Sequence, residues 1–207
     1  MTINSTLPTK NNLIKIRNSI KLSEQGQELL EKKKYILIKE REKYENECRR
    51  LRKLLNETYE KASLMIRRTN VEIGIEEVSY ISRGVKIDNG IDIKFKTIMG
   101  VEIPSIIYEN QEKETNYGIY ETPISLDEAI IEFHKIKEIL IELAGVENTI
   151  ERLNKNIAKV QKRSNALSDI IIPRDKALEK SINEIISERE REEFSRLKVV
   201  KKNKGGN

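Results

Sequence analysis

The stretch that decides the fold is residues 136–171, IKEILIELAGVENTIERLNKNIAKVQKRSNALSDII. Positions spaced alternately by three and four residues along it are apolar at ten of eleven places, and Ser164 is the exception. Such spacing, sustained over five repeats, gives one face of a helix a narrow apolar stripe suited to left-handed coiled-coil packing. We therefore predict a coiled-coil seam formed by Ile136, Ile139, Leu143, Val146, Ile150, Leu153, Ile157, Val160, Leu167 and Ile171.

A partner for this stripe is expected in the N-terminal third of the chain. Residues 9–70 contain one glycine, Gly26, and no proline, and Thr9 after Pro8 is suited to cap a helix. Eleven of seventeen positions in one three/four phase are apolar, and the interruptions include Thr58 and Thr69. A helix over 9–70 would be about 90 Å long at 1.5 Å per residue. It cannot bury its stripe alone, so we expect an antiparallel pair with the C-terminal helix.

The C-terminal helix carries signals for its start and for an interruption. Ser125 and Glu128 match a capping box, in which the serine oxygen accepts from a backbone N–H while the glutamate reaches back. Pro173 removes a backbone donor and clashes with the preceding turn, so we predict a kink there. Beyond it, Leu178, Ile182 and Ile185 resume a helical spacing toward Phe194 and Leu197.

Between the two helices the period of the apolar residues changes to two. Val85, Ile87, Ile91, Ile93 and Phe95 alternate with polar residues, which is typical of half-buried strands. The Asn-Gly pair at 89–90 favours a type I′ turn, so we predict a small β-hairpin over 85–103. Residues 72–81 fit either a helix bent near position 74 or a strand, and 105–120 read as a loop.

Together these signals predict a mainly α protein. We expect a long antiparallel two-helix coiled coil with a small β-hairpin region at the end opposite the termini. The expected parts of this single structural unit are a flexible N-terminus (1–8), a long helix (9–82), a β-hairpin and loop (83–124), a second long helix (125–198) and a basic C-terminal tail (199–207).

Composition and charge agree with an elongated helical protein. Charged residues make up 35% of the chain and aromatic residues 5%, which leaves too little apolar surface for a thick core. Residues 1–70 carry 17 Lys and Arg against 9 Asp and Glu, whereas residues 71–124 carry 5 against 10. No run of 18 apolar residues occurs, and the single cysteine, Cys48, falls on the apolar stripe as a small buried hydrophobe. We expect a cytoplasmic protein.

No pattern for catalysis stands out. His134 is the one histidine and has no cysteine nearby, so it is a poor metal ligand candidate. The sequence has no glycine-rich phosphate loop and no grouping of nucleophile, base and orienting residue. We therefore expect no catalytic residue, no metal and no cofactor, and a protein that is not an enzyme in its own right.

Several motifs, in order along most of the chain, resemble the D subunits of the V-type (A/V-type) ATPases. They are PTKNNL (8–13), IMGVEIP (98–104), YG (117–118) leading into LDEA (126–129), RSNAL (163–167), IPR (172–174) and EREREEFSRLK (188–198). The chain departs from the family at Ser164, where an apolar residue is usual.

The resemblance implies a non-catalytic central rotor shaft that couples ATP hydrolysis or synthesis in a head of A and B subunits to ion movement through a membrane ring. It also implies contacts with the F subunit and with the C (also called d) subunit of the central stalk, and no direct binding of nucleotide or nucleic acid. Basic residues near both termini are then expected to face the inside of the head: Lys10, Arg17, Lys21, Arg191, Arg196, Lys198 and Lys201. The candidate region for the F subunit comprises Val85, Ile87, Ile91, Ile93, Ile98, Met99 and Val101.

Two other classes of function fit the pattern of charge. A basic coiled-coil hairpin could bind nucleic acid through its N-terminal arm, since phosphate contacts need clustered lysine and arginine. A generic coiled-coil scaffold is the third possibility. Steeply salt-dependent binding of RNA or DNA would separate the first of these from a rotor.

Overall fold

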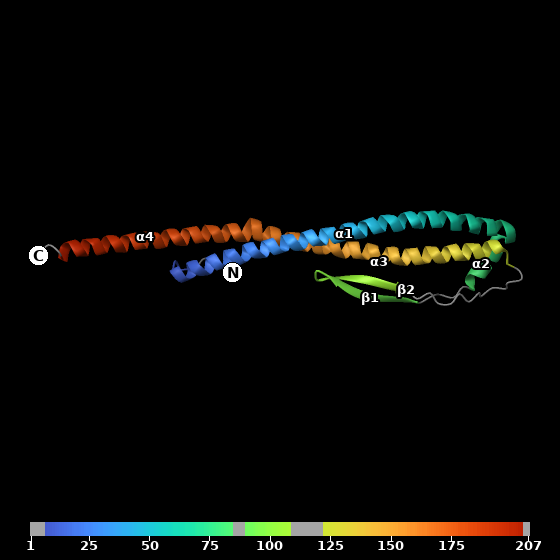
Figure 1. Ribbon diagram of the computed structural model, residues 1–207, viewed down its shortest axis with the longest axis horizontal. Helices are drawn as coiled ribbons and strands as arrows, with labels where there is room; N and C mark the ends of the chain where they lie inside the picture. Colours follow the sequence, from blue (N-terminus) through green and yellow to red (C-terminus); the bar gives the residue numbers. More distant parts are fainter. Residues whose placement is uncertain (1–6, 85–89, 109–121, 205–207) are drawn as a thin grey trace. The chain divides into compact units, whose positions relative to one another are not determined.

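The computed structural model describes residues 7–84, 90–108 and 122–204 (Figure 1). Its elements in chain order are α1 (Lys10–Ile73), α2 (Ile75–Arg83), β1 (Ile91–Ile98), β2 (Val101–Tyr108), α3 (Ile124–Ala166), the π-helical turn η1 (Leu167–Ile171) and α4 (Ile172–Lys204). Over these residues the fold is mainly α with a small antiparallel hairpin, as predicted. Residues 1–6 of the expected flexible N-terminus, 109–121 of the expected loop and 205–207 of the expected tail lie outside the described residues.

The ends of α1 follow local rules. The backbone N–H of Asn12 donates to Thr9 Oγ1 at 3.3 Å, so Thr9 is the N-cap that the sequence predicts. At the other end Gly74 has a φ of +89°, a conformation that costs side-chain-bearing residues energy, and α1 stops there. The chain then continues as the short helix α2. Of the two alternatives predicted for residues 72–81, the helix bent near position 74 is therefore the one observed.

The chain divides into two compact units, and each contains an antiparallel helix pair. In the unit Ile36–Ile157, Arg52 contacts Glu147 and Ser125 contacts Glu72, so α1 and this part of α3 run in opposite directions (Figure 1). In the unit formed by Met1–Tyr35 and Ala158–Asn207, Lys10 pairs with Glu190 and Glu24 pairs with Lys176, which gives the same direction of pairing.

Each unit buries the stripes that the periodicity indicates. In the unit Ile36–Ile157, Cys48, Leu51 and Leu143 form a buried cluster, and Leu55, Ile139, Val146 and Ile150 pack against it. Leu37 and Leu153 have no exposed surface. In the other unit Leu13 and Ile20 of α1 are buried, as are Val160 of α3 and Ile182 of α4.

The β-hairpin lies later in the chain than the sequence analysis predicts. β1 pairs with β2 in a register that sets Ile98 opposite Val101, and Met99 and Gly100, both with positive φ, form the turn. The described hairpin therefore turns at 99–100, the predicted turn at 89–90 includes a residue outside the described ranges, and residues 105–108 belong to β2 rather than to a loop. Val85, Ile87 and Asn89 lie outside the described residues.

Two boundaries of the C-terminal helices also differ from expectation. Ser125 is not an N-cap but the second residue of α3, and its hydroxyl donates to Glu72 Oε2 at 2.5 Å, because an acceptor on α1 outcompetes the local backbone. Near Pro173, where a kink is predicted, the helix contains the π-helical turn η1. α4 then continues through the expected tail to Lys204, with lysines in its last turn, where cations complement the helix dipole.

Candidate functional surfaces

The described residues hold no group of three or more His, Cys, Asp or Glu side chains that could bind a metal ion. His134 lies half-buried on α3 and belongs to no such group within the described ranges. Among the same residues, no helix combines the length and apolar character needed to cross a membrane. The features that can carry function are therefore the helix pairs and the exposed surfaces beside them.

The predicted seam residues occupy one face of the C-terminal helices. Ile136, Leu143, Leu153 and Val160 are buried. Ile139, Val146, Ile150, Ile157, Leu167 and Ile171 are half-buried. Opposite them, the stripe of α1 holds at its polar interruptions as well: Thr58 and Thr69 are buried.

Ion pairs and hydrogen bonds flank both helix pairs. In the unit Ile36–Ile157, Arg52 Nη2 lies 2.7 Å from Glu147 Oε1, and Arg41 Nη1 donates to Asn154 Oδ1 at 3.4 Å. The carboxylate of Glu147 and the neighbouring Cys48 raise the pKa of the Arg52 guanidinium. These groups are largely solvated, so the pairs orient the helices more than they stabilise them.

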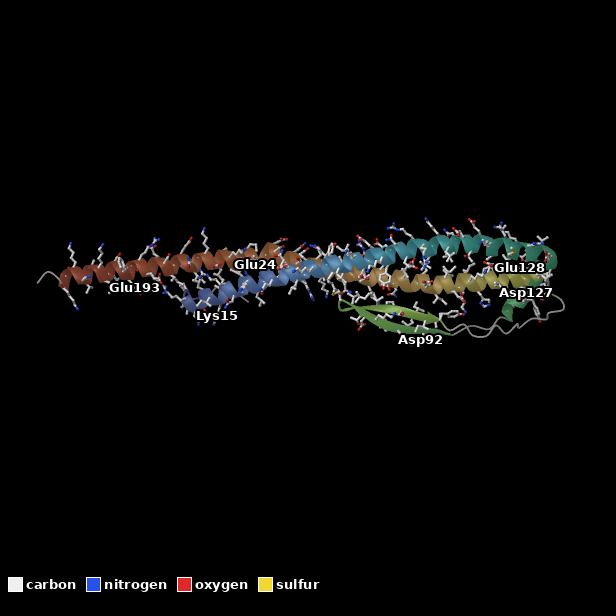
Figure 2. The ribbon with its side chains drawn as sticks, viewed as in Figure 1. Lys15, Glu24, Asp92, Asp127, Glu128 and Glu193 are labelled. Carbon is white, nitrogen blue, oxygen red and sulfur yellow. The ribbon has the colours of Figure 1, made fainter. Side chains whose placement is uncertain are left out.

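The second unit carries its own bonds between helices. Lys10 Nζ lies 2.7 Å from Glu190 Oε1, Arg17 Nε 2.8 Å from Glu179 Oε1, and Lys176 Nζ 2.8 Å from Glu24 Oε1. The hydrogen bond and charge of Glu190 raise the pKa of Lys10. Figure 2 shows the polar side chains projecting from these helices, including Glu24 and Lys15 of α1 and Glu193 of α4.

Two polar pairs within the same unit each contain one buried side chain. Ser164, 2% exposed, donates its hydroxyl to Glu31 Oε1 at 2.7 Å. Asp175, 9% exposed, accepts from Arg174 at 2.9 Å and from Ser19 Oγ at 3.5 Å. Each pair joins α1 to a C-terminal helix at a specific position, so each helps to fix the register.

The predicted head-contact residues are all exposed and all lie in the unit that contains both termini. Four are engaged within the chain: Lys10 and Arg17 as above, Arg191 with Glu188, and Arg196 with Glu192. Apolar side chains accompany the basic ones near the end of α4, and sequence analysis did not assign them to a site: Phe194, Leu197, Val199 and Val200.

The hairpin presents a second surface. Ile91, Ile93 and Met99 of the predicted region are exposed, Ile98 is half-buried and Val101 is buried. Val85 and Ile87 of the same prediction lie outside the described residues.

Phe95 belongs to this surface too, at 58% exposed, and sequence analysis left it out although it shares the period-two pattern. Contacts with α3 hold the hairpin in place. Arg152 lies 5.4 Å from the centre of the Phe95 ring and donates to the Glu102 carbonyl at 3.2 Å. Ile106 packs against Gly145, where a Cβ atom would lie 3.3 Å from its Cδ1.

Comparison with known proteins identifies relatives that match nearly the whole chain. A family model for the D subunit of ATP synthase matches residues 12–202. The V-type ATP synthase D subunit of Thermotoga neapolitana is 37% identical over 197 residues, which cover 95% of this chain and 97% of the relative. The A-type ATP synthase D subunit of Pyrococcus abyssi is 39% identical over 197 residues, with 94% and 92% covered. The A-type D subunit of Methanobrevibacter smithii is 34% identical, with 94% and 85% covered.

Proposed function

Because the chain belongs to the family of ATP synthase D subunits, we propose that it is the central rotor shaft of a rotary V-type ATPase or ATP synthase. As a member of that family the chain is one component of such an enzyme and not an enzyme in its own right. The shaft would couple ATP hydrolysis or synthesis in the head to ion translocation through the membrane ring. The observation that supports this role best is the antiparallel pairing of long helices in a chain that matches the family over most of its length.

A shaft needs resistance to twisting more than it needs reactive groups. Two helices that share a buried seam cannot turn independently, because turning either one exposes apolar side chains such as Leu51 and Leu153 to water. Pairs such as Arg52–Glu147 in one unit and Arg17–Glu179 in the other add directional contacts between the paired helices. Torque applied to one helix would therefore pass to the other.

The partners follow from the two exposed surfaces. We assign the basic side chains near both termini to the inside of the A and B head, and the hairpin around Ile91–Ile98 and Met99 to the F subunit. The C (d) subunit would connect the shaft to the membrane ring. The chain would then be cytoplasmic, held at the membrane through the complex, and would bind neither nucleotide nor nucleic acid itself.

The assignment of the F subunit to the hairpin can be tested by affinity. Ile93 is 52% exposed on β1, and Leu22 is 71% exposed on α1 in the other unit. Ile93→Lys is expected to weaken binding of the purified F subunit at least about tenfold, because a charge would be buried in an apolar contact. The matched variant Leu22→Lys should bind like the wild type. If Ile93→Lys also binds normally, the hairpin is not the contact; if the wild type elutes separately from the F subunit, the rotor assignment itself is in doubt.

The coupling role can be tested in the reconstituted complex. Leu153 is fully buried in the seam, and a proline there would remove a backbone hydrogen bond and break the helix locally. Leu153→Pro is expected to leave ATP hydrolysis running while ion transport per ATP falls. Hydrolysis and transport that stay in the wild-type ratio would show that the helix pair does not transmit torque. Leu140→Ala, at a position 47% exposed on the same helix, serves as the control and should leave the ratio unchanged.

A further inference from the structure

The buried stripe of the C-terminal helices changes phase in the unit that contains the termini. Up to α3's end it follows the predicted spacing, with Val160 and Ser164 at 6% and 2% exposed. Continued at alternating steps of three and four, the stripe would include Arg174, Leu178, Ser181 and Ile185. Leu178 is half-buried, but the other three side chains are exposed, Ile185 by 40%.

The covered positions lie one residue later. Ile172, Asp175 and Ile182 are buried, and Glu179 and Ile186 between and beyond them are half-buried. Their steps are again three, four, three and four. The stripe therefore keeps its spacing on both sides of η1 and is displaced by a single residue, which corresponds to about 100° around a helix of 3.6 residues per turn.

A π-helical turn supplies this displacement. Its hydrogen bonds span five residues instead of the four of an α-helix, so one such turn holds an extra residue within an otherwise α-helical segment. We propose that η1 (Leu167–Ile171) is a one-residue insertion in the heptad pattern, and that the π-helical turn absorbs it so that α4 keeps its apolar face on α1. The insertion belongs to the packing of the chain itself and holds whatever partners the protein has.

Polar contacts fix the phase on each side of the turn. Ser164 donates to Glu31 immediately before η1, and Asp175 accepts from Ser19 just after it. A continuous α-helix would carry Asp175 off the stripe and remove its contact with Ser19. Leu167 keeps the turn itself close to α1, since its Cδ1 lies 3.9 Å from the position of a Cβ atom on Gly26.

Pro173 also favours the π-helical turn η1. In a continuous α-helix its ring would clash with the carbonyl of the residue four positions earlier, Asp169. The wider π-helical turn ends two residues before Pro173 and spans Asp169. The phase shift and the proline therefore favour the same local structure, and an experiment must separate them.

Single-residue deletions in the full-length chain test the insertion. Deleting Asp169, an exposed residue of η1, should turn the segment into α-helix and leave Ile182 and Ile186 on the stripe. The melting temperature of this Asp169 deletion variant is expected to stay within about 3 °C of that of the wild type. Deleting Lys180, an exposed residue of α4, removes the same backbone length but displaces both isoleucines. Amide exchange beyond residue 180 is then expected to accelerate at least about tenfold.

The outcomes are distinct. If deleting Asp169 accelerates exchange in α4 as much as deleting Lys180 does, η1 is not an insertion. If both deletions leave exchange unchanged, phase does not govern the packing, and the proposal also falls.

A cross-link separates phase from proline and needs neither deletion to fold. In a Cys48→Ala background, Ser19→Cys with Asp175→Cys should form a disulfide on mild oxidation, because the two side chains are in contact. If the one-residue insertion causes the π-helical turn, the cross-link should persist when Pro173→Ala is added. Loss of the cross-link on adding Pro173→Ala would mean that the proline alone creates the turn, and would overturn the proposal.

Discussion

At the scale of single residues, the threonines within the apolar stripes explain why polar interruptions do not break the packing. Thr58, Thr69 and Thr149 are buried, and each donates its hydroxyl to the carbonyl four residues earlier, at 2.7, 3.0 and 2.8 Å. A hydroxyl bonded within its own helix leaves its methyl group free to pack. Scoring Thr58 and Thr69 as gaps in the α1 stripe therefore underestimated how continuously the stripe packs.

Ser164 differs because its acceptor is a carboxylate on α1. Lys34 and Ser164 hydrogen-bond the Glu31 carboxylate and lower its pKa. A carboxylate with a lowered pKa in the folded state binds fewer protons than in the unfolded state. Its contribution to stability is thus present above the ordinary glutamate pKa and is lost as pH falls through the lowered value.

We predict that Ser164→Ala lowers the free energy of unfolding at pH 7 by about 1–2 kcal/mol, as expected for a lost hydrogen bond to a charged group. The difference from wild type should shrink as pH falls through the lowered pKa of Glu31, because the protonated carboxyl is a weaker hydrogen-bond acceptor than the carboxylate. Urea unfolding at a series of pH values measures both. Ser187→Ala, whose hydroxyl bonds to its own helix at the Glu184 carbonyl, is the control. A difference that is independent of pH would contradict the role given to Glu31.

Burial decides the cost of truncating leucines on α3. Leu153 has no exposed surface, whereas Leu140 is 47% exposed. We predict that Leu153→Ala lowers the free energy of unfolding by about 3 kcal/mol, through lost transfer energy and a residual cavity. Leu140→Ala should cost less than about 1 kcal/mol. Denaturant titrations of the two variants provide the comparison, and equal losses would refute the seam.

At the scale of secondary-structure elements, the hairpin turns at a place for which the sequence gives only a weak signal. Asn89-Gly90 is the dipeptide most typical of a type I′ turn, yet the described hairpin turns at Met99-Gly100, with φ values of +49° and +76°. Met99 is an unusual residue for positive φ. Pro104 lies opposite Phe95 within β2, where a missing N–H is tolerated because a two-stranded sheet has only edge strands.

The strain at Met99 yields a prediction. Asparagine adopts the left-handed conformation more readily than methionine does, so Met99→Asn should stabilise the hairpin by about 0.5–1 kcal/mol. Thr97→Asn, which puts the same amide into the extended strand β1, should not stabilise it. Amide exchange of β1 and β2 measures the effect. Faster exchange in Met99→Asn would show that the methionine side chain, rather than the turn geometry, holds the hairpin.

The sequence predicts those parts of the fold in which burial repeats with the period of the helix. Heptad spacing predicted the seam through Ser164 and the antiparallel fold, because burial repeats with the helix. It did not predict the displaced stripe at Ile172 and Asp175, since an insertion leaves the spacing intact on each side. Exposed surfaces such as that around Phe95 make few contacts within the chain. Their role depends on partner proteins, and the periodicity of the sequence carries no information about such contacts.

At the scale of the whole molecule, many basic side chains form ion pairs with carboxylates of the same chain. Residues 1–70 carry an excess of eight positive charges, which by itself would suit a phosphate backbone. In the structure, however, many of these cations face carboxylates. Lys10 pairs with Glu190, Arg17 with Glu179 and Arg52 with Glu147, and other pairs join neighbouring turns of α1. Alternating signs give a weak field outside the molecule and favour contacts with specific protein surfaces over a polyanion.

This arrangement predicts that the chain does not bind nucleic acid usefully at physiological salt. Fluorescence anisotropy with a mixed-sequence single-stranded RNA should give a Kd weaker than about 10 μM at 0.15 M salt, within the range of non-specific binding. Glu179→Lys with Glu190→Lys removes the partners of Arg17 and Lys10, and should bind the same RNA more tightly and with a steeper salt dependence. That variant shows that the assay can detect an unmasked basic arm. Tight, saturable and steeply salt-dependent binding by the wild type would favour the nucleic-acid hairpin over the rotor, because a shaft that turns within a protein head has no use for a free phosphate-binding surface.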